Sequence, residues 1–229
     1  MGYYTRYAIY YAPRDGLMQA GSVWLGWDAV TGTDVAQPSL DGLALPMSAI
    51  TATPRKYGFH ATIKAPFRLA EGLTGDDLGE ALGALAGHLT PVLVEGLEVA
   101  RLGDFLALRP VGDVTRLQAM AGEVVERLDR YRAPLSESDL AKRNPNALSP
   151  RQRDLLDRYG YPYVFEQFQM HMTLSGRLIP EAAEAVAAVA RREFAPYLGV
   201  PHLIDTLCLF GEEPESGRFH LLHRYALTG

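Results

Sequence analysis

The chain has 229 residues and a formal net charge of −5 at pH 7, with 48% hydrophobic and 21% charged residues. This is the composition of an ordinary globular protein, and it excludes the disordered and fibrous classes. The acidic balance argues against a dedicated binder of duplex DNA or of long nucleic acid, because such proteins present basic surfaces. Cys208 is the only cysteine, which excludes an intramolecular disulfide and a cysteine-based zinc cluster.

The amino terminus lacks the basic and apolar regions of a signal peptide, and no apolar run approaches the roughly 18 residues of a membrane span. We therefore expect a cytoplasmic protein without membrane contact. The pattern indicates no particular oligomeric state.

Strand and helix patterns alternate along the chain. The expected strands are residues 5–11, 57–65, 92–99, 105–108, 165–175, 203–210 and 219–227. The expected helices are residues 74–89, 115–131 and 180–194. Residues 12–54 are rich in glycine and proline and are expected to form loops around a short element at 24–27. The polar segment 134–162 contains a helix start at Ser149-Pro150. Strand, helix and hairpin thus occur twice, which indicates an internal duplication.

Two of these strands carry the same polar pattern on one face. In 57–65 the polar face holds Gly58, His60, Thr62 and Lys64. In 165–175 it holds Gln167, Gln169, His171, Thr173 and Ser175. The i, i+2 spacing places an imidazole and a hydroxyl side by side on each strand. An ordinary solvent face would carry more Lys, Glu and Arg, so the pattern favours the lining of a cleft.

Paired histidines suit the cleavage of a phosphodiester. An imidazole titrates near pH 6.5, so one ring can accept a proton while the other donates one. The base would activate an attacking water or hydroxyl, and the acid would protonate the leaving oxygen. Threonine hydroxyls can donate hydrogen bonds to the non-bridging oxygens, where charge develops. This chemistry requires neither a metal nor a cofactor.

His60-Ala61-Thr62 and His171-Met172-Thr173 resemble the two H-x-[ST] motifs of the 2H phosphoesterases, a family that includes cyclic phosphodiesterases and RNA ligase-like enzymes. Their contexts, RKYGFHATIKAPFRL and YVFEQFQMHMTLSGRL, are similar to a bacterial subgroup associated with phosphonate-utilisation operons. The resemblance implies that His60 and His171 are the acid–base pair, and that Thr62 and Thr173 bind phosphate.

The resemblance also implies an α+β fold. Residues 1–229 would form one domain of two pseudo-symmetric lobes, in which antiparallel sheets flank a central cleft and helices cover the outer faces. The first motif lobe is expected at about 55–133 and the second at about 163–229. Residues 134–162 would be a polar connecting segment or a lid that brings positive charge toward an anionic substrate.

Five further residues are candidates for substrate binding. Lys64 shares the expected face of His60 and could neutralise a phosphate oxygen, although a charged residue at a strand end is the alternative. Ser175 is its counterpart in the second strand, and Arg177 could continue that face or begin the loop. Tyr11 and Tyr163 could stack on a base or sugar, although such residues are more often half-buried core.

These observations predict a metal-independent phosphoesterase acting on a small cyclic phosphate ester, and the resemblance implies a link to phosphonate metabolism. Two alternatives stay open. One is a metal-dependent hydrolase with His60 and His171 as ligands, which neither motif face supports with carboxylates. The other is a non-catalytic module that binds a nucleotide or a phosphorylated metabolite.

Overall fold

The computed structural model describes residues 3–229. Its centre is a seven-stranded sheet, and every strand pair in the described chain is antiparallel. In spatial order the strands are β11 (Phe219–Ala226), β10 (Thr206–Glu212), β1 (Tyr7–Tyr11), β4 (Ala61–Phe67), β8 (Met172–Thr173), β7 (Phe105–Val111) and β6 (Gly96–Leu102). The predicted α+β class with antiparallel strands is confirmed.

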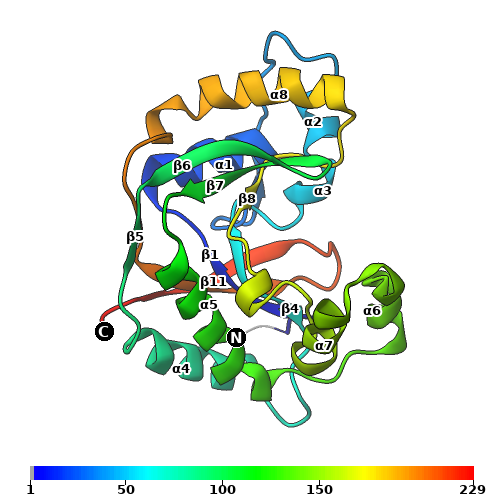
Figure 1. Cartoon of the computed structure of the whole chain (residues 1–229), viewed down its shortest axis with the longest axis vertical. Helices are drawn as coiled ribbons and strands as arrows, with labels where there is room; N and C mark the ends of the chain where they lie inside the picture. The colour runs from blue at the N-terminus through cyan, green and yellow to red at the C-terminus, as the bar shows by residue number, and fades with distance from the viewer. Residues whose placement is uncertain (1–2) are drawn as a thin grey trace.

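The helices cover the two halves of this sheet separately. They are α1 (Asp15–Leu25), α2 (Met47–Ile50), α3 (Ala52–Arg55), α4 (Gly75–Ala86), α5 (Thr115–Arg127), α6 (Glu137–Lys142), α7 (Pro150–Tyr159) and α8 (Pro180–Glu193). Helix α4 packs on β10 and β11, α5 packs on β4, and α8 packs on β6 and β7 (Figure 1). None of the helices in the described chain is long and apolar enough to cross a membrane.

The three predicted long helices form as α4, α5 and α8, and the starts of α4 and α7 carry capping boxes. Thr74 and Asp77 make a reciprocal capping box at the start of α4, and Ser149 and Gln152 make another at the start of α7. The buried faces of α4, α5 and α8 follow the expected helical spacing and join one continuous core.

Each hairpin lies on the side of the sheet that holds the motif strand of the other half of the chain. The β6–β7 hairpin pairs through β7 with β8, whereas the carboxyl-terminal β10–β11 hairpin reaches β4 through β1. This pairing differs from the expected lobes at 55–133 and 163–229, because it exchanges their hairpins. The two halves also meet in one sheet through β4 and β8.

Some elements differ from the sequence prediction. The stretch expected to run through 92–99 divides into β5 (Val92–Val94) and β6, because β5 leaves the main sheet to pair with β9 (His202–Ile204). Helix α1 lies in the region expected to be loops. Its Gly21 packs directly against Phe59, where an added Cβ would lie 2.1 Å from the ring. Gly21 thus allows α1 to lie close to the Phe59 ring, and it does not interrupt the helix.

We predict that Gly21→Ala lowers the free energy of unfolding by about 1–3 kcal/mol, because the Phe59 ring is fully buried and cannot move aside. Urea denaturation measures the change. The matched control is Gly87→Ala, at a right-handed backbone position whose nearest atom would lie 3.4 Å away. Equal stability of the two variants would contradict the packing argument.

Candidate active site

The two H-x-T motifs lie side by side because their middle residues are partners in the sheet. Ala61 of β4 pairs with Met172 of β8, and both side chains are fully buried on the far face. Extending this antiparallel register by one residue places His60 across from Thr173 and Thr62 across from His171. Directly opposed residues have Cβ atoms about 4.5–5.5 Å apart. Four polar side chains from two distant segments therefore share one small area.

Both histidines are held by the backbone in the same way. Nδ1 of His60 lies 2.9 Å from the Gly58 carbonyl oxygen, and Nδ1 of His171 lies 2.7 Å from the Gln169 carbonyl oxygen. A carbonyl only accepts, so Nδ1 carries the proton in each ring. The lone pair of each neutral imidazole is then on Nε2, and Nε2 of His60 lies 3.4 Å from Thr62 Oγ1.

His60 is enclosed by aromatic rings. It stacks on Tyr10 with ring centroids 3.8 Å apart, and Tyr57 lies 6.0 Å away. Burial lowers the pKa of His60 to about 4; the Gly58 carbonyl acts in the opposite direction, and the charge of His171 lowers it further. Gly58 has a left-handed φ of +73°, and a Cβ there would lie 2.5 Å from Ala29 Cβ. Glycine is therefore required at position 58 for the backbone to present this carbonyl to His60 Nδ1.

His171 has a more open setting. Its ring lies 5.6 Å from that of Phe105, and its side chain is partly exposed. Burial lowers its pKa below 6.5, while the hydrogen bond to the Gln169 carbonyl opposes the shift. Both rings are therefore predominantly neutral at pH 7, with His60 the weaker base.

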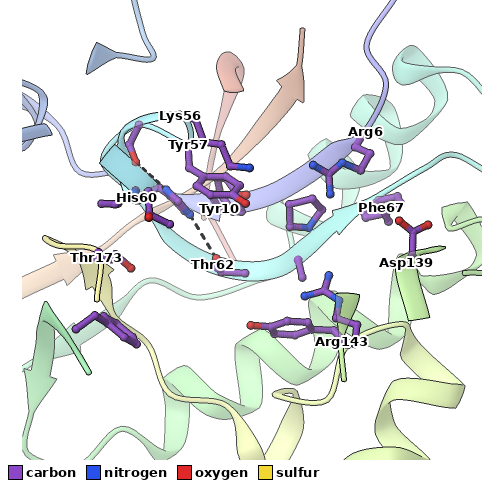
Figure 2. Close-up of a pocket in the computed structure, with 18 of the residues that line it drawn as sticks. Arg6, Tyr10, Lys56, Tyr57, His60, Thr62, Phe67, Asp139, Arg143 and Thr173 are labelled. Atoms are coloured by element: carbon purple, nitrogen blue, oxygen red, sulfur yellow. Dashed lines mark hydrogen bonds between the residues drawn. The ribbon is translucent and has the colours of Figure 1, made fainter. Parts of the chain in front are cut away.

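A cavity of about 730 Å³ opens beside the first motif. His60, Thr62 and Thr173 line one part of it, as Figure 2 shows. His171 is not among its lining residues, whereas its neighbour Phe105 is. Other lining side chains come from β1 and the residue before it, from the segments on either side of β4, from α6 and from the segment after it; they include Arg6, Tyr10, Lys56, Tyr57, Arg68, Asp139, Arg143 and Tyr161. In the described part of the chain, no three His, Cys, Asp or Glu side chains are grouped as metal ligands would be.

A family model described as "Protein of unknown function (DUF1045)" matches residues 62–220. The chain belongs to the DUF1045 family. Two curated relatives are each named ribose 1,5-bisphosphate phosphokinase PhnN. One, from Janthinobacterium sp. (strain Marseille), is 38% identical over 98% of this chain and 51% of its own length. The other, from Laribacter hongkongensis (strain HLHK9), is 36% identical over 93% of this chain and 49% of its own length. The chain spans about half the length of these relatives.

Solved structures that match nearly the full length of this chain include E. coli LigT complexed with 3′-AMP. That structure is 14% identical, covers 99% of this chain and 100% of its own, and has a TM-score of 0.49. A crystal structure named only as a phosphoesterase is 14% identical over 98% of this chain and 99% of its own, with a TM-score of 0.46. The protein TT0787 of Thermus thermophilus is 14% identical over 98% of both chains, with a TM-score of 0.41.

In this DUF1045 chain, Lys64 was expected to bind substrate, but it does not line the cavity. The register of β4 with β1 shifts between Thr62 and Lys64, so the alternation of faces breaks there. Lys64 is 3% exposed, and its Nζ donates to the Val125 carbonyl and to Asp129 at 3.0 Å. Its role is thus to join β4 to α5, against the expectation that it faces the phosphate.

Ser175 and Arg177 lie in the cavity wall but are already engaged. The Ser175 hydroxyl accepts from the Leu106 amide and donates to the Gly176 carbonyl, and the residue is only 1% exposed. Arg177 is almost fully exposed at the rim, where it pairs with Asp104 at 3.1 Å. The second motif strand is also shorter than the expected 165–175. Only Met172 and Thr173 are extended in the sheet, and residues 165–167 form a short 3₁₀ turn.

The two tyrosines expected to stack on a substrate do not line the cavity. Tyr11 is buried, and its hydroxyl lies 2.8 Å from His202 Nε2. Tyr163 is half exposed and packs edge-on against Tyr161. Their neighbours Tyr10 and Tyr161 line the cavity instead. The sequence showed the tyrosine-rich strand, but not which of its faces meets His60.

The segment 134–162 contributes directly to the cavity. Asp139 and Arg143, from α6 and its end, and Tyr161 all line it. Arg143 and Lys56 were not expected site residues. The basic composition of 142–158 was the one available signal for Arg143, whereas Lys56 stands next to the first motif without any spacing pattern.

We predict that Lys64→Met lowers the free energy of unfolding by about 1–3 kcal/mol, because it removes a buried ion pair and leaves the Val125 carbonyl without its donor. The measurement is urea denaturation at pH 7. Lys56→Met, at an exposed position, is the matched control and should change stability by less than about 0.5 kcal/mol. A Lys64→Met protein as stable as the wild type would refute a structural role for this lysine.

Proposed function

We propose that the chain is a 2H phosphoesterase that opens a small cyclic phosphodiester without a metal. The observation that supports this most strongly is the Ala61–Met172 pairing, which brings the two H-x-T motifs together beside the cavity. The identical carbonyl tether on both imidazoles supports it further, because each ring is left with Nε2 as its reactive nitrogen.

The reaction follows from these two nitrogens. One imidazole takes a proton from water through Nε2, and the water oxygen attacks phosphorus. The bond from phosphorus to one ring oxygen of the cyclic ester then breaks, and the second imidazole donates its Nε2 proton to that oxygen. Hydroxyls of Thr62 and Thr173 donate to the non-bridging oxygens, whose negative charge grows in the transition state. Atoms and protons balance, and the product is a phosphate monoester.

We assign His60 as the base and His171 as the acid. The pKa of His60 is about 4, and that of His171 is lowered less. When one proton is shared between the two rings, it therefore resides mostly on His171. The reactive form, with His60 neutral and His171 protonated, is then the predominant singly protonated state.

A small phosphorylated sugar or nucleoside fits the site better than a long nucleic acid. The cavity volume of about 730 Å³ is that of a small-molecule site, and the chain is acidic overall. The names of the curated relatives concern a ribose bisphosphate and carry the designation PhnN. This supports a sugar-borne cyclic phosphate and agrees with the phosphonate link that the motif resemblance implies.

We predict that His60→Ala lowers kcat for nucleoside 2′,3′-cyclic phosphates and ribose cyclic phosphates by about 10²–10⁴-fold, and that His171→Ala does the same. Thr62→Ala and Thr173→Ala should cost less. An aryl phosphodiester distinguishes the base from the acid, because its leaving group departs without taking up a proton. On this substrate His171→Ala should keep most of the wild-type activity, whereas His60→Ala should not. Turnover assays with excess EDTA measure these effects, and His88→Ala, at an exposed position, is the control.

Other outcomes would identify the alternatives. Activity that EDTA abolishes and a divalent metal restores would support a metal-dependent hydrolase. Unchanged turnover in either histidine variant would overturn the acid–base assignment. Phosphate-ester binding without cleavage of any substrate would support a binding module.

The pH profile of kcat/KM should be bell-shaped with its maximum below pH 6.5. Below this maximum, activity falls as His60 takes up a proton with a pKa of about 4. Above it, activity falls as His171 loses the proton that it must donate, because its pKa is also lowered from 6.5. Initial rates at low substrate concentration between pH 3.5 and 9 give the profile. A maximum above pH 7.5 would contradict this assignment.

A further inference from the structure

The cavity contains more positive charge than the proposed reaction needs. Its cationic lining residues are Arg6, Lys56, Arg68, Arg143 and Arg177. Three of them are neutralised by ion pairs, namely Arg6 with Glu212, Arg68 with Asp139, and Arg177 with Asp104. Lys56 and Arg143 have no ion pair with any residue in the described part of the chain. A protein with a net charge of −5 thus maintains two cations without an ion pair in its main cavity.

Both of these cations are held over tyrosine rings. Lys56 Nζ lies 4.7 Å from the centre of the Tyr57 ring, and the Arg143 guanidinium carbon lies 4.9 Å from that of Tyr161. Such stacking orients a cation while its N–H groups remain available for a ligand. For Arg143 the guanidinium edge can bind two phosphate oxygens at once.

The neighbouring carboxylate does not compensate Arg143. Asp139 lies four residues earlier, where an ion pair would be expected. It is bonded instead to Arg68 and to the Ser136 hydroxyl and amide. Arg143 is therefore left facing the cavity from the end of α6.

The position of Arg143 relative to the motifs leaves room for a second group. In Figure 2, Arg143 lies beyond Thr62 as seen from His60, while Lys56 lies on the other side of the cavity next to Tyr57. A single cyclic phosphate at His60 and Thr62 would occupy only part of about 730 Å³.

We propose that Arg143, held over the Tyr161 ring, forms a second anion subsite, which binds a phosphate group distinct from the one that is cleaved. The substrate class is then a cyclic phosphate ester on a sugar or nucleoside that carries a further phosphate, and the product is a bisphosphate. This inference rests on the proposed function for its cleavage step, but the subsite itself is a binding site that can be tested without turnover.

The first test compares matched substrates. Adenosine 2′,3′-cyclic phosphate and its 5′-phosphorylated form are assayed together with a ribose cyclic phosphate with and without a 5-phosphate. The wild type should favour the doubly phosphorylated member in kcat/KM by about 10- to 100-fold, the effect of charge-assisted hydrogen bonds. Arg143→Met, which keeps contact with Tyr161, should abolish most of this preference. Arg153→Met, on the exposed face of α7, should leave the preference unchanged.

The second test measures binding alone. By isothermal titration, adenosine 3′,5′-bisphosphate should bind more tightly than adenosine 3′-phosphate, and Arg143→Met should reduce that difference about tenfold or more, whereas Arg153→Met should not. Arg143→Lys should restore part of it. A carboxylate analogue in place of the 5′-phosphate tests whether the subsite requires phosphate.

The outcomes separate the two proposals. A binding preference lost in Arg143→Met, without turnover of any cyclic ester, would support the subsite and refute the phosphoesterase function. Turnover with no preference for a second phosphate, or a preference that Arg143→Met retains, would overturn the subsite. Tighter binding of the carboxylate analogue than of the phosphate would overturn the assignment to phosphate.

Discussion

The pairing of β4 with β8 is the contact on which the rest of the site depends. It is short, yet it joins the two halves of the sheet and aligns two motifs that lie 111 residues apart. Ala61 and Met172 are fully buried beneath it, so the register is fixed by packing on the far face. A slip of either motif strand by one residue would turn the histidine of that strand toward the core. The juxtaposition of the two H-x-T motifs is therefore a product of core packing.

The sequence predicted the buried faces of the two motif segments and two helix starts, because these signals are local. Alternation of polar and apolar residues showed which faces of 60–63 and 169–174 are buried, and capping residues located the starts of α4 and α7. Lys64 was misplaced because a register shift is determined by the partner strand and leaves no periodic trace. Helix α1 was missed because glycine in a sequence usually indicates a break in a helix, whereas Gly21 provides the space for the Phe59 ring.

The wider cavity could not be predicted, since its walls come from tertiary placement. Nothing in the sequence indicated that Tyr10, and not Tyr11, would stack on His60, because both faces of β1 are buried. Similarly, Arg143 reaches the cavity only through the position of α6, and Lys56 only through the turn before the first motif. The two H-x-T motifs were thus evident in the sequence, whereas the other residues that line the cavity were not.

The position of β1 between β4 and β10 has a consequence for how the protein folds. Its residues pair with a strand about two hundred positions later, and Arg6 is bonded to Glu212 across the same junction. During synthesis, β1 can find one of its two partners only after residues 206–212 have emerged from the ribosome. Such non-local pairing makes folding slow. Tyr10, which supports His60, is in this strand, so the environment of His60 is completed only when the last hairpin docks.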